Sequence, residues 1–163
     1  MSKAFKLSFV ILGMWIGMTC LIDFVAVPAV FRNVSSRQEA GTLGMIIFNT
    51  FNYVEVVFAV LFASCTFLFK EKIKLKKTYG FLCTFLILLS LTYAFYMSPR
   101  ITEVNRAKWN LQEGTREYQV LNQEHQFLHS TFRKTDSVKI LILLFLIGAG
   151  IARKENEDQM ETV

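Results

Sequence analysis

Several polar residues lie within or beside long apolar stretches of this sequence, where a side chain that can carry charge is costly. They comprise three acids, three cations and two asparagines: Asp23, Asn49, Asn52, Glu55, Arg100, Arg133, Asp136 and Lys139. An unpaired charge in hydrocarbon costs at least about 2.5–3.5 kcal/mol, so such residues usually face a bundle interior or a cavity. Because the acids and cations could neutralise one another, the set predicts a polar intramembrane pocket that binds a small solute or an ion.

Glu55 is the deepest of these acids and the sharpest candidate for a functional group. Asn49, Asn52 and Glu55 recur at a spacing of three residues, which confines them to about a third of a helix circumference. Asparagines inside membranes commonly join helices through hydrogen bonds. Two structural alternatives stay open: Glu55 could accept an ordinary structural hydrogen bond, and Arg133 and Lys139 could extend to the outer membrane surface.

The segment HQFLH places His125 and His129 on one face of a helix, at a spacing that can hold one metal ion. No glutamate follows the first histidine, so this is not a zinc-protease motif, and no second histidine pair exists for a haem. The alternative is that both are ordinary polar residues at the outer membrane edge. We expect no cofactor and no enzymatic activity, with metal or haem binding at His125 and His129 as the alternative hypothesis.

The composition is that of an integral membrane protein. Of 163 residues, 53% are hydrophobic and the mean hydropathy is +0.37, which is too apolar for an ordinary soluble domain. Few prolines and glycines favour long helices, and no alternating pattern of outer-membrane strands is present. Because backbone hydrogen bonds must close within each spanning segment, the sequence predicts an all-α bundle of four transmembrane helices in a single domain, over residues 7–31, 43–69, 79–113 and 116–152.

The polar stretch from residue 99 to residue 133 is too long for a structureless loop in a compact protein. Its apolar residues recur with helical periodicity, Gly114 interrupts the pattern, and Thr115 is a suitable helix start. We therefore expect helices 3 and 4 to continue beyond the membrane on its outer side and to pack as an antiparallel pair. Residues 153–163 are expected to form a polar C-terminal tail.

The distribution of lysine and arginine predicts the orientation. The run KEKIKLKK at residues 70–77 occupies a short loop, where positive charge favours the cytoplasmic side. This predicts an N-in, C-in protein of the bacterial inner (cytoplasmic) membrane. The net charge of +5 then reflects topology, and no nucleic-acid partner is expected. The expected partners are the lipid bilayer and either a second copy of the chain or another membrane protein.

Small residues in the apolar segments are expected to serve packing. Gly13 and Gly17 form a GxxxG pattern, which permits close contact between membrane helices. Pro28 should disturb the last turn of the first helix. Cys20, Cys65 and Cys83 stand singly in different helices and form no disulfide framework.

Three segments carry a resemblance to a known family: residues 15–48, SPRITEVNR at 98–106, and FLHSTFRKTDSVKILILL at 127–144. They resemble the domain-of-unknown-function 4149 family, which includes transmembrane protein 205. The residues that carry this likeness are Trp15, Gly17, Pro28, Phe31, Ala40, Gly41, Pro99, Arg100, His129 and Ser137. The resemblance implies a four-helix membrane protein without established chemistry. More distantly, the chain is similar to copper-resistance-D-type bundles, some relatives of which handle metal or haem.

Together these features favour a non-enzymatic membrane bundle that handles a small solute or ion, or binds a partner, through a polar pocket in its outer half. A metal- or haem-binding redox module that uses His129, and with it His125, is the first alternative. A structural subunit of a larger membrane complex is the second.

Overall fold

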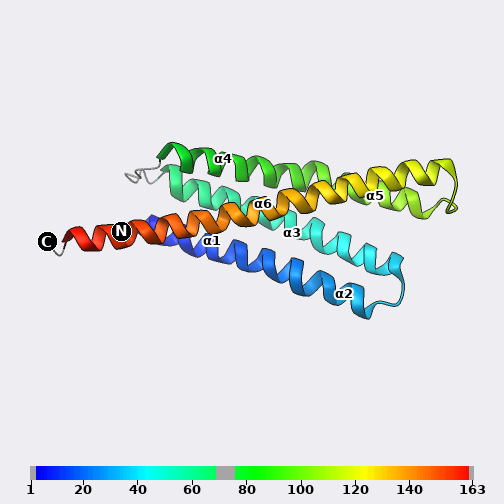
Figure 1. Cartoon of the computed structure of the whole chain (residues 1–163), viewed down its shortest axis with the longest axis horizontal. Helices are drawn as coiled ribbons and strands as arrows, with labels where there is room; N and C mark the ends of the chain where they lie inside the picture. The colour runs from blue at the N-terminus through cyan, green and yellow to red at the C-terminus, as the bar shows by residue number, and fades with distance from the viewer. Residues whose placement is uncertain (1–2, 69–75, 162–163) are drawn as a thin grey trace.

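Four antiparallel helical rods form the bundle in this computed structural model, which describes residues 3–68 and 76–161 (Figure 1). The first rod joins α1 (Lys3–Leu21), the π-helical turn η1 (Ile22–Ala26) and α2 (Val27–Asn33). The second rod is α3 (Arg37–Leu68). The third joins α4 (Lys76–Thr92), the π-helical turn η2 (Tyr93–Met97) and α5 (Ser98–Trp109), and the fourth is α6 (Arg116–Glu161). The predicted all-α fold is confirmed.

Each rod of the described chain contains a helix long and apolar enough to cross a membrane: Phe5–Asn33, Arg37–Thr66, Lys77–Trp109 and Arg116–Ala152. Large apolar side chains also cover the outward surface of the bundle, and Phe24, Phe81 and Phe127 are each about 70% exposed. Surfaces of this kind are stable against lipid and not against water. The chain is therefore an integral membrane protein.

Side-chain caps determine where α3 and α6 begin. The Glu39 backbone N–H donates to the Ser36 hydroxyl at 3.3 Å, so α3 begins at Arg37 and not at the expected residue 43. This is the Ser-x-x-Glu pattern of a helix N-terminus. At α6 the Tyr118 backbone N–H donates to the Thr115 hydroxyl at 3.2 Å. Gly114 precedes this cap with a φ of +95°, a conformation that favours glycine.

The other ends of the helices differ in part from the expected bounds. The third rod ends at Trp109, before the expected residue 113. Residues 153–161, expected as a tail, continue α6 as helix to Glu161. Residue 69 and residues 70–75 of the lysine run lie outside the described residues.

Both prolines of the chain stand two residues after the end of a π-helical turn. A proline has no N–H and its ring collides with the carbonyl four residues earlier. The helix widens just before each one: the Val27 N–H bonds the Ile22 carbonyl ahead of Pro28, and the Ser98 N–H bonds the Tyr93 carbonyl ahead of Pro99. The disturbance expected at Pro28 thus lies in the preceding turn, and a matching one occurs in the third rod.

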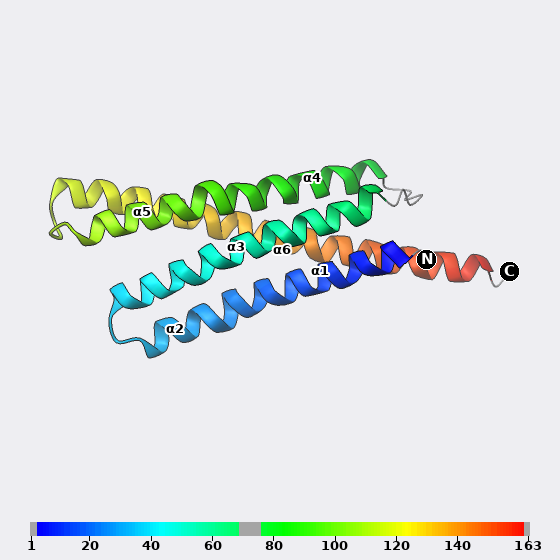
Figure 2. The ribbon, with the colours of Figure 1, turned by 180° about the vertical axis from the view of Figure 1, so that it is seen from behind.

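The helix α5 and the first half of α6 run side by side as the predicted antiparallel pair (Figures 1 and 2). The Arg100 Nε donates to the Glu124 carboxylate at 2.8 Å, and Lys108 donates to the Asn122 side chain at 3.4 Å. The first residues of α1 and the last of α6 lie at the opposite end of the bundle.

Two apolar clusters form the core, one on each side of a polar level. The larger cluster includes Trp15, Phe62 and Leu143, and the smaller one consists of Tyr93, Met97 and Phe132. Along α6 the boundary falls between Phe132 and Leu143, and the buried Asp136 and Lys139 lie in that interval. Toward the end of the bundle where α5 and α6 are joined, the apolar part of α6 is therefore continued by residues that the bundle encloses.

The helix contact expected at Gly13 and Gly17 does not occur within the described chain, because a Cβ added at either position would meet nothing within 4 Å. The close contact lies at Gly150 of α6, where an added Cβ would stand 1.9 Å from the ring of Phe9. Gly150, and not the GxxxG pair, allows α1 and α6 to approach.

We predict that Gly150→Leu destabilises the bundle by about 1–3 kcal/mol, the usual cost of overpacking. Gly148→Leu is the matched control, because a Cβ there meets nothing within 4 Å; its effect should stay within about 0.5 kcal/mol. Thermal melting in detergent, followed by circular dichroism, measures both. Equal effects of the two substitutions would contradict this account of the α1–α6 contact.

Candidate functional site

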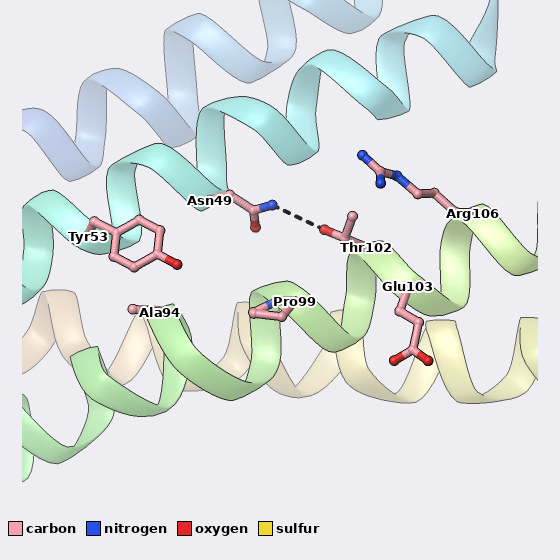
Figure 3. Close-up of a pocket in the computed structure, with 7 residues that line it drawn as sticks. All are labelled: Asn49, Tyr53, Ala94, Pro99, Thr102, Glu103 and Arg106. Atoms are coloured by element: carbon pink, nitrogen blue, oxygen red, sulfur yellow. Dashed lines mark hydrogen bonds between the residues drawn. The ribbon is translucent and has the colours of Figure 1, made fainter.

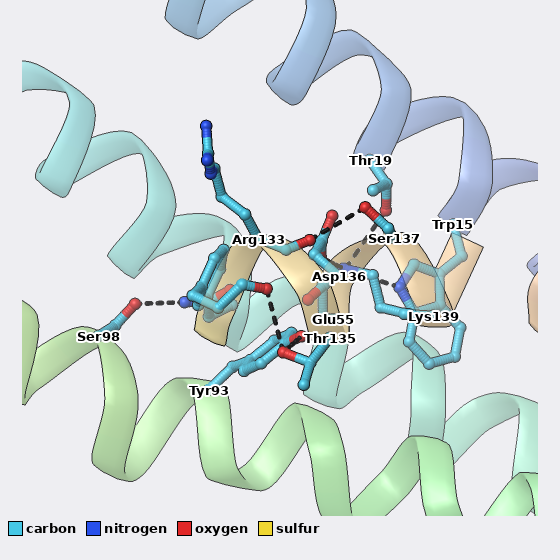
Figure 4. Close-up of polar contacts among 12 residues, drawn as sticks. Trp15, Thr19, Glu55, Tyr93, Ser98, Arg133, Thr135, Asp136, Ser137 and Lys139 are labelled. Atoms are coloured by element: carbon cyan, nitrogen blue, oxygen red, sulfur yellow. Dashed lines mark hydrogen bonds and ion pairs between the residues drawn. The ribbon is translucent and has the colours of Figure 1, made fainter. Parts of the chain in front are cut away.

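A buried lysine with two acids forms the centre of the polar level (Figure 4). The Lys139 ammonium makes ion pairs with Glu55 of α3 and Asp136 of its own helix. The exposed fractions of the three side chains are 2%, 0% and 10%. The attraction within a buried ion pair offsets the cost of desolvating the two charges only when the geometry is good and further hydrogen bonds satisfy the remaining polar atoms. The alternative in which Lys139 extends to the membrane surface is therefore wrong, and Asp136 finds its partner in Lys139.

The first rod supplies the hydrogen bonds that hold Glu55. Trp15 Nε1 and the Thr19 hydroxyl both donate to Glu55 Oε1, at 3.0 Å and 3.3 Å. Trp15, Thr19 and Asp23 follow one another at four-residue spacing, which places them along one face of the helix. Asp23 lies in η1 and lines the same cavity as Asp136. Asp23, Glu55, Asp136 and Lys139 are called the carboxyl–lysine cluster below.

Trp15 and Thr19 were missed as site residues by the sequence reasoning. Their signal was present, because a tryptophan and a threonine precede Asp23 at the spacing of one helical turn each. Tyr93 and Phe51 were missed as well. Their rings lie 5.5 Å and 6.0 Å from the Lys139 nitrogen, where an aromatic ring stabilises a cation.

Asn49 and Asn52 join α3 to the third rod. The side-chain amide of Asn52 donates to the Ser98 hydroxyl, and that of Asn49 donates to the Thr102 hydroxyl at 3.2 Å. Figure 3 shows the second bond beside a groove of about 480 Å³ between α3 and α5, which Tyr53 and Arg106 also line. Both asparagines thus take the helix-joining role that is usual for this residue in membranes.

Arg100 and Arg133 lie outside the carboxyl–lysine cluster, unlike the balanced set expected from the sequence. Arg100 pairs with Glu103 at 2.9 Å and with Glu124 at 2.6 Å. Arg133 is exposed, and Figure 4 shows its side chain pointing away from Lys139 and Glu55. A long arginine side chain can extend away from the bundle interior. The side chain of Asp136 is too short to extend with Arg133 and to pair with it there. Within the described part of the chain, Lys139 is consequently the cation that pairs with the buried acids of this cluster, Glu55 and Asp136.

A cavity of about 1110 Å³ leads from the cluster to the end of the bundle where α5 and α6 are joined. Asp23 and Asp136 line its inner end, while Glu113 and Tyr118 line its outer end near the turn between α5 and α6. Its walls combine apolar and polar side chains of the first rod, α3, α5 and α6, among them Phe48, Asn49 and Ser98. The cavity can therefore admit a solute to two carboxyl groups that are otherwise enclosed.

The two histidines of HQFLH also line this cavity. The ring centroids of His125 and His129 lie 5.9 Å apart, as expected for neighbouring turns of one helix. Among the residues that the structure describes, no group of three or more histidine, cysteine, aspartate or glutamate side chains is arranged to hold a metal ion. Protein zinc sites supply at least three ligands, so a metal or haem at this pair stays a hypothesis.

A comparison with protein families adds to this geometry. The family model described as "Domain of unknown function (DUF4149)" matches residues 10–110, which is more than half of the chain. The chain belongs to the DUF4149 family. A search of the curated proteins and a search of the solved structures found no match. Of the cluster of this DUF4149 protein, Asp23 and Glu55 fall within the matched stretch, and Asp136 and Lys139 follow it.

We predict that Lys139→Met destabilises the protein by about 3–5 kcal/mol, because Glu55 and Asp136 lose their shared buried cation. Adding Glu55→Gln should recover part of that loss. Lys134→Met, on an exposed position of the same helix, is the control and should change stability by no more than about 0.5 kcal/mol. Thermal melting in detergent across the cycle tests this. Additivity of the two cluster substitutions within about 0.5 kcal/mol would refute the buried pair.

Proposed function

We propose that this DUF4149 protein handles a small cation or a small solute that carries a cationic group, which it binds in the cavity at the outer half of the bundle. The observation that carries the proposal is the cluster at the inner end of that cavity, where Asp23 and Asp136 line the wall and Asp136 and Glu55 share one buried cation, Lys139. The exposed Arg133 also lines this cavity. A cationic ligand is the chemistry that offsets an excess of acid in a site of low dielectric constant.

The shape of the cavity supports a small ligand. Its volume of about 1110 Å³ is slightly above the usual range of small-molecule sites, which is roughly 300–1,000 Å³. Phe31, Met45 and Trp109 give it apolar walls, while Asp23 and Asp136 provide convergent polar groups at one end. Such sites combine apolar lining with a few polar groups that orient the ligand.

The proposal includes the orientation inferred from the sequence. The cavity opens at the end of the bundle opposite the first residues of α1 and the last of α6. With both ends in the cytoplasm, as the lysine-rich run at residues 70–77 of the sequence favours, the ligand enters from outside. In a bacterial cell this would be the outer side of the inner membrane.

Two alternatives predict different behaviour. A structural subunit of a larger complex requires no ligand and co-purifies with a partner in mild detergent. A metal- or haem-binding redox module would use His125 and His129, which do line the cavity, and would show an absorption spectrum or bound metal after purification.

The test is a thermal-stability panel in detergent with chloride salts of sodium, potassium, methylammonium and tetramethylammonium, and with N-methylglucamine as the reference cation. A ligand at 100 times its Kd stabilises the folded state by about 2.7 kcal/mol. We expect at least one small cation to stabilise the protein more than the reference does. Asp23→Asn should abolish this difference, and Glu117→Gln, on the exposed start of α6, should preserve it.

Equal melting temperatures in all five salts would contradict the proposal, as would a stabilisation that Asp23→Asn leaves intact. Glu117→Gln changes the net charge of the protein by the same amount as Asp23→Asn, so this control separates a local effect from general screening.

A further inference from the structure

An acidic and a cationic side chain line the large cavity without pairing with each other. Asp23 belongs to η1 of the first rod, and Arg133 belongs to α6. Neither side chain makes an ion pair in the part of the chain that the structure describes. Figures 1 and 2 show the first rod diverging from α6 beyond α1, and the cavity is lined from both of these elements. It therefore offers one acid and one cation, from different helices, to whatever enters it.

The other cations at the cavity differ from Arg133 in contacts or in position. Lys139 is paired with two acids of the cluster, and Lys108 is hydrogen-bonded across the α5–α6 pair. Arg37 lines the cavity from the exposed first residue of α3. Arg133 precedes Asp136 by three residues, which is about 4.5 Å along a helix axis. Arg133 is thus the cation without an acidic partner that stands next to the acids at the inner end.

These two groups differ in the ligand charge that each one binds. A guanidinium presents planar N–H donors that match the oxygens of a carboxylate or a phosphate in pairs, and a carboxyl group accepts hydrogen bonds from an ammonium. A simple cation at Asp23 would leave Arg133 without an anion. A ligand with both charges supplies a partner to each group and adds no net charge, which matters because unpaired charge in a membrane bundle is costly.

An aromatic pair forms part of the wall beside Arg133. The ring centroids of Phe48 and Phe132 lie 5.6 Å apart, and both residues line the cavity. Aromatic rings attract ammonium groups, and they are the usual surroundings of quaternary ammonium ligands. The wall therefore suits a primary amine and a methylated amine alike.

We propose that the cavity binds a small zwitterion, with its cationic amine at Asp23 and Asp136 and its carboxylate or phosphate at the Arg133 guanidinium. The proposal deepens the function proposed above and rests on it, because that function supplies the site for the cationic group. The ligand chemistry is an amine and an anion joined by a short linker, which occurs in free amino acids and betaines and also in lipid headgroups. Such a ligand connects the first rod to α6 where the two diverge.

Two matched pairs of compounds test the anionic group on the full chain in detergent. Glycine is methylammonium with an added carboxylate, and glycine betaine is tetramethylammonium with an added carboxylate. Thermal melting over a concentration series gives an apparent Kd for each compound. In at least one pair we expect the carboxylate to lower the Kd by about tenfold, which corresponds to about 1.4 kcal/mol.

Arg133→Gln should remove this advantage without weakening the binding of the matched cation. Lys134→Gln, at an exposed neighbouring position, changes the net charge equally and should retain the advantage. Osmolytes at high concentration stabilise folded proteins in general, so the effect must also saturate. Circular dichroism verifies that each variant is folded.

Glycerophosphocholine, the free headgroup of a lipid, distinguishes the two sources of the ligand. Tighter binding of this compound than of glycine betaine, lost in Arg133→Gln, would assign a lipid phosphate to Arg133. The reverse order, with the same loss, would assign the carboxylate of a free solute. Both results support the zwitterion site.

Equal affinity for each zwitterion and its matched cation would overturn the inference, and so would an advantage that persists in Arg133→Gln. In either case, stabilisation by methylammonium or tetramethylammonium that is lost in Asp23→Asn would leave the proposed cation site in place. Stabilisation by none of the compounds would overturn the zwitterion and the cation site together.

Discussion

The structure depends on one constraint: a lysine enclosed in a membrane bundle must be neutralised from within. Lys139 is surrounded by Glu55, Asp136 and two aromatic rings, and these groups come from three of the four rods. The hydrogen bonds of Trp15 and Thr19 to Glu55 bring in the first rod. Because an unpaired ion here would be strongly destabilising, this network fixes the relative depth of the helices more strictly than the apolar contacts above and below it, which many registers could satisfy.

The two π-helical turns lie at the same level as that network. Asp23 lies in η1, and Tyr93, whose hydroxyl donates to Thr135 at 2.7 Å, lies in η2. Each turn precedes one of the chain's prolines. A π-helical turn shifts the direction of the side chains that follow it, and such turns occur frequently at functional sites. The prolines therefore account for the two widened turns. The polar residues Asp23 and Tyr93 lie within these turns.

Much of the architecture could be predicted from the sequence, because apolar length and the Gly114–Thr115 break are local signals. The candidate site could be predicted only in part. Asp23, Glu55, Asp136 and Lys139 were found because charge is conspicuous in an apolar segment. Arg100 and Arg133 were assigned to the same group, since residue type and depth do not show which way a long side chain extends. For Gly13 and Gly17 the pattern marks a smooth helix face but does not identify what covers it, and within the described chain no side chain comes within 4 Å of a Cβ added at either position.

The central claim is that the Lys139 ammonium lies in direct contact with the carboxylates of both Glu55 and Asp136 inside the bundle. Magic-angle-spinning NMR of the protein in lipid bilayers measures it, through dipolar coupling between lysine Nζ labelled with ¹⁵N and side-chain carboxyl carbons labelled with ¹³C in Asp and Glu. The account predicts that one lysine signal, lost in Lys139→Arg, couples to one glutamate and one aspartate carboxyl carbon. A Lys139 signal coupled to neither carboxyl carbon would contradict it.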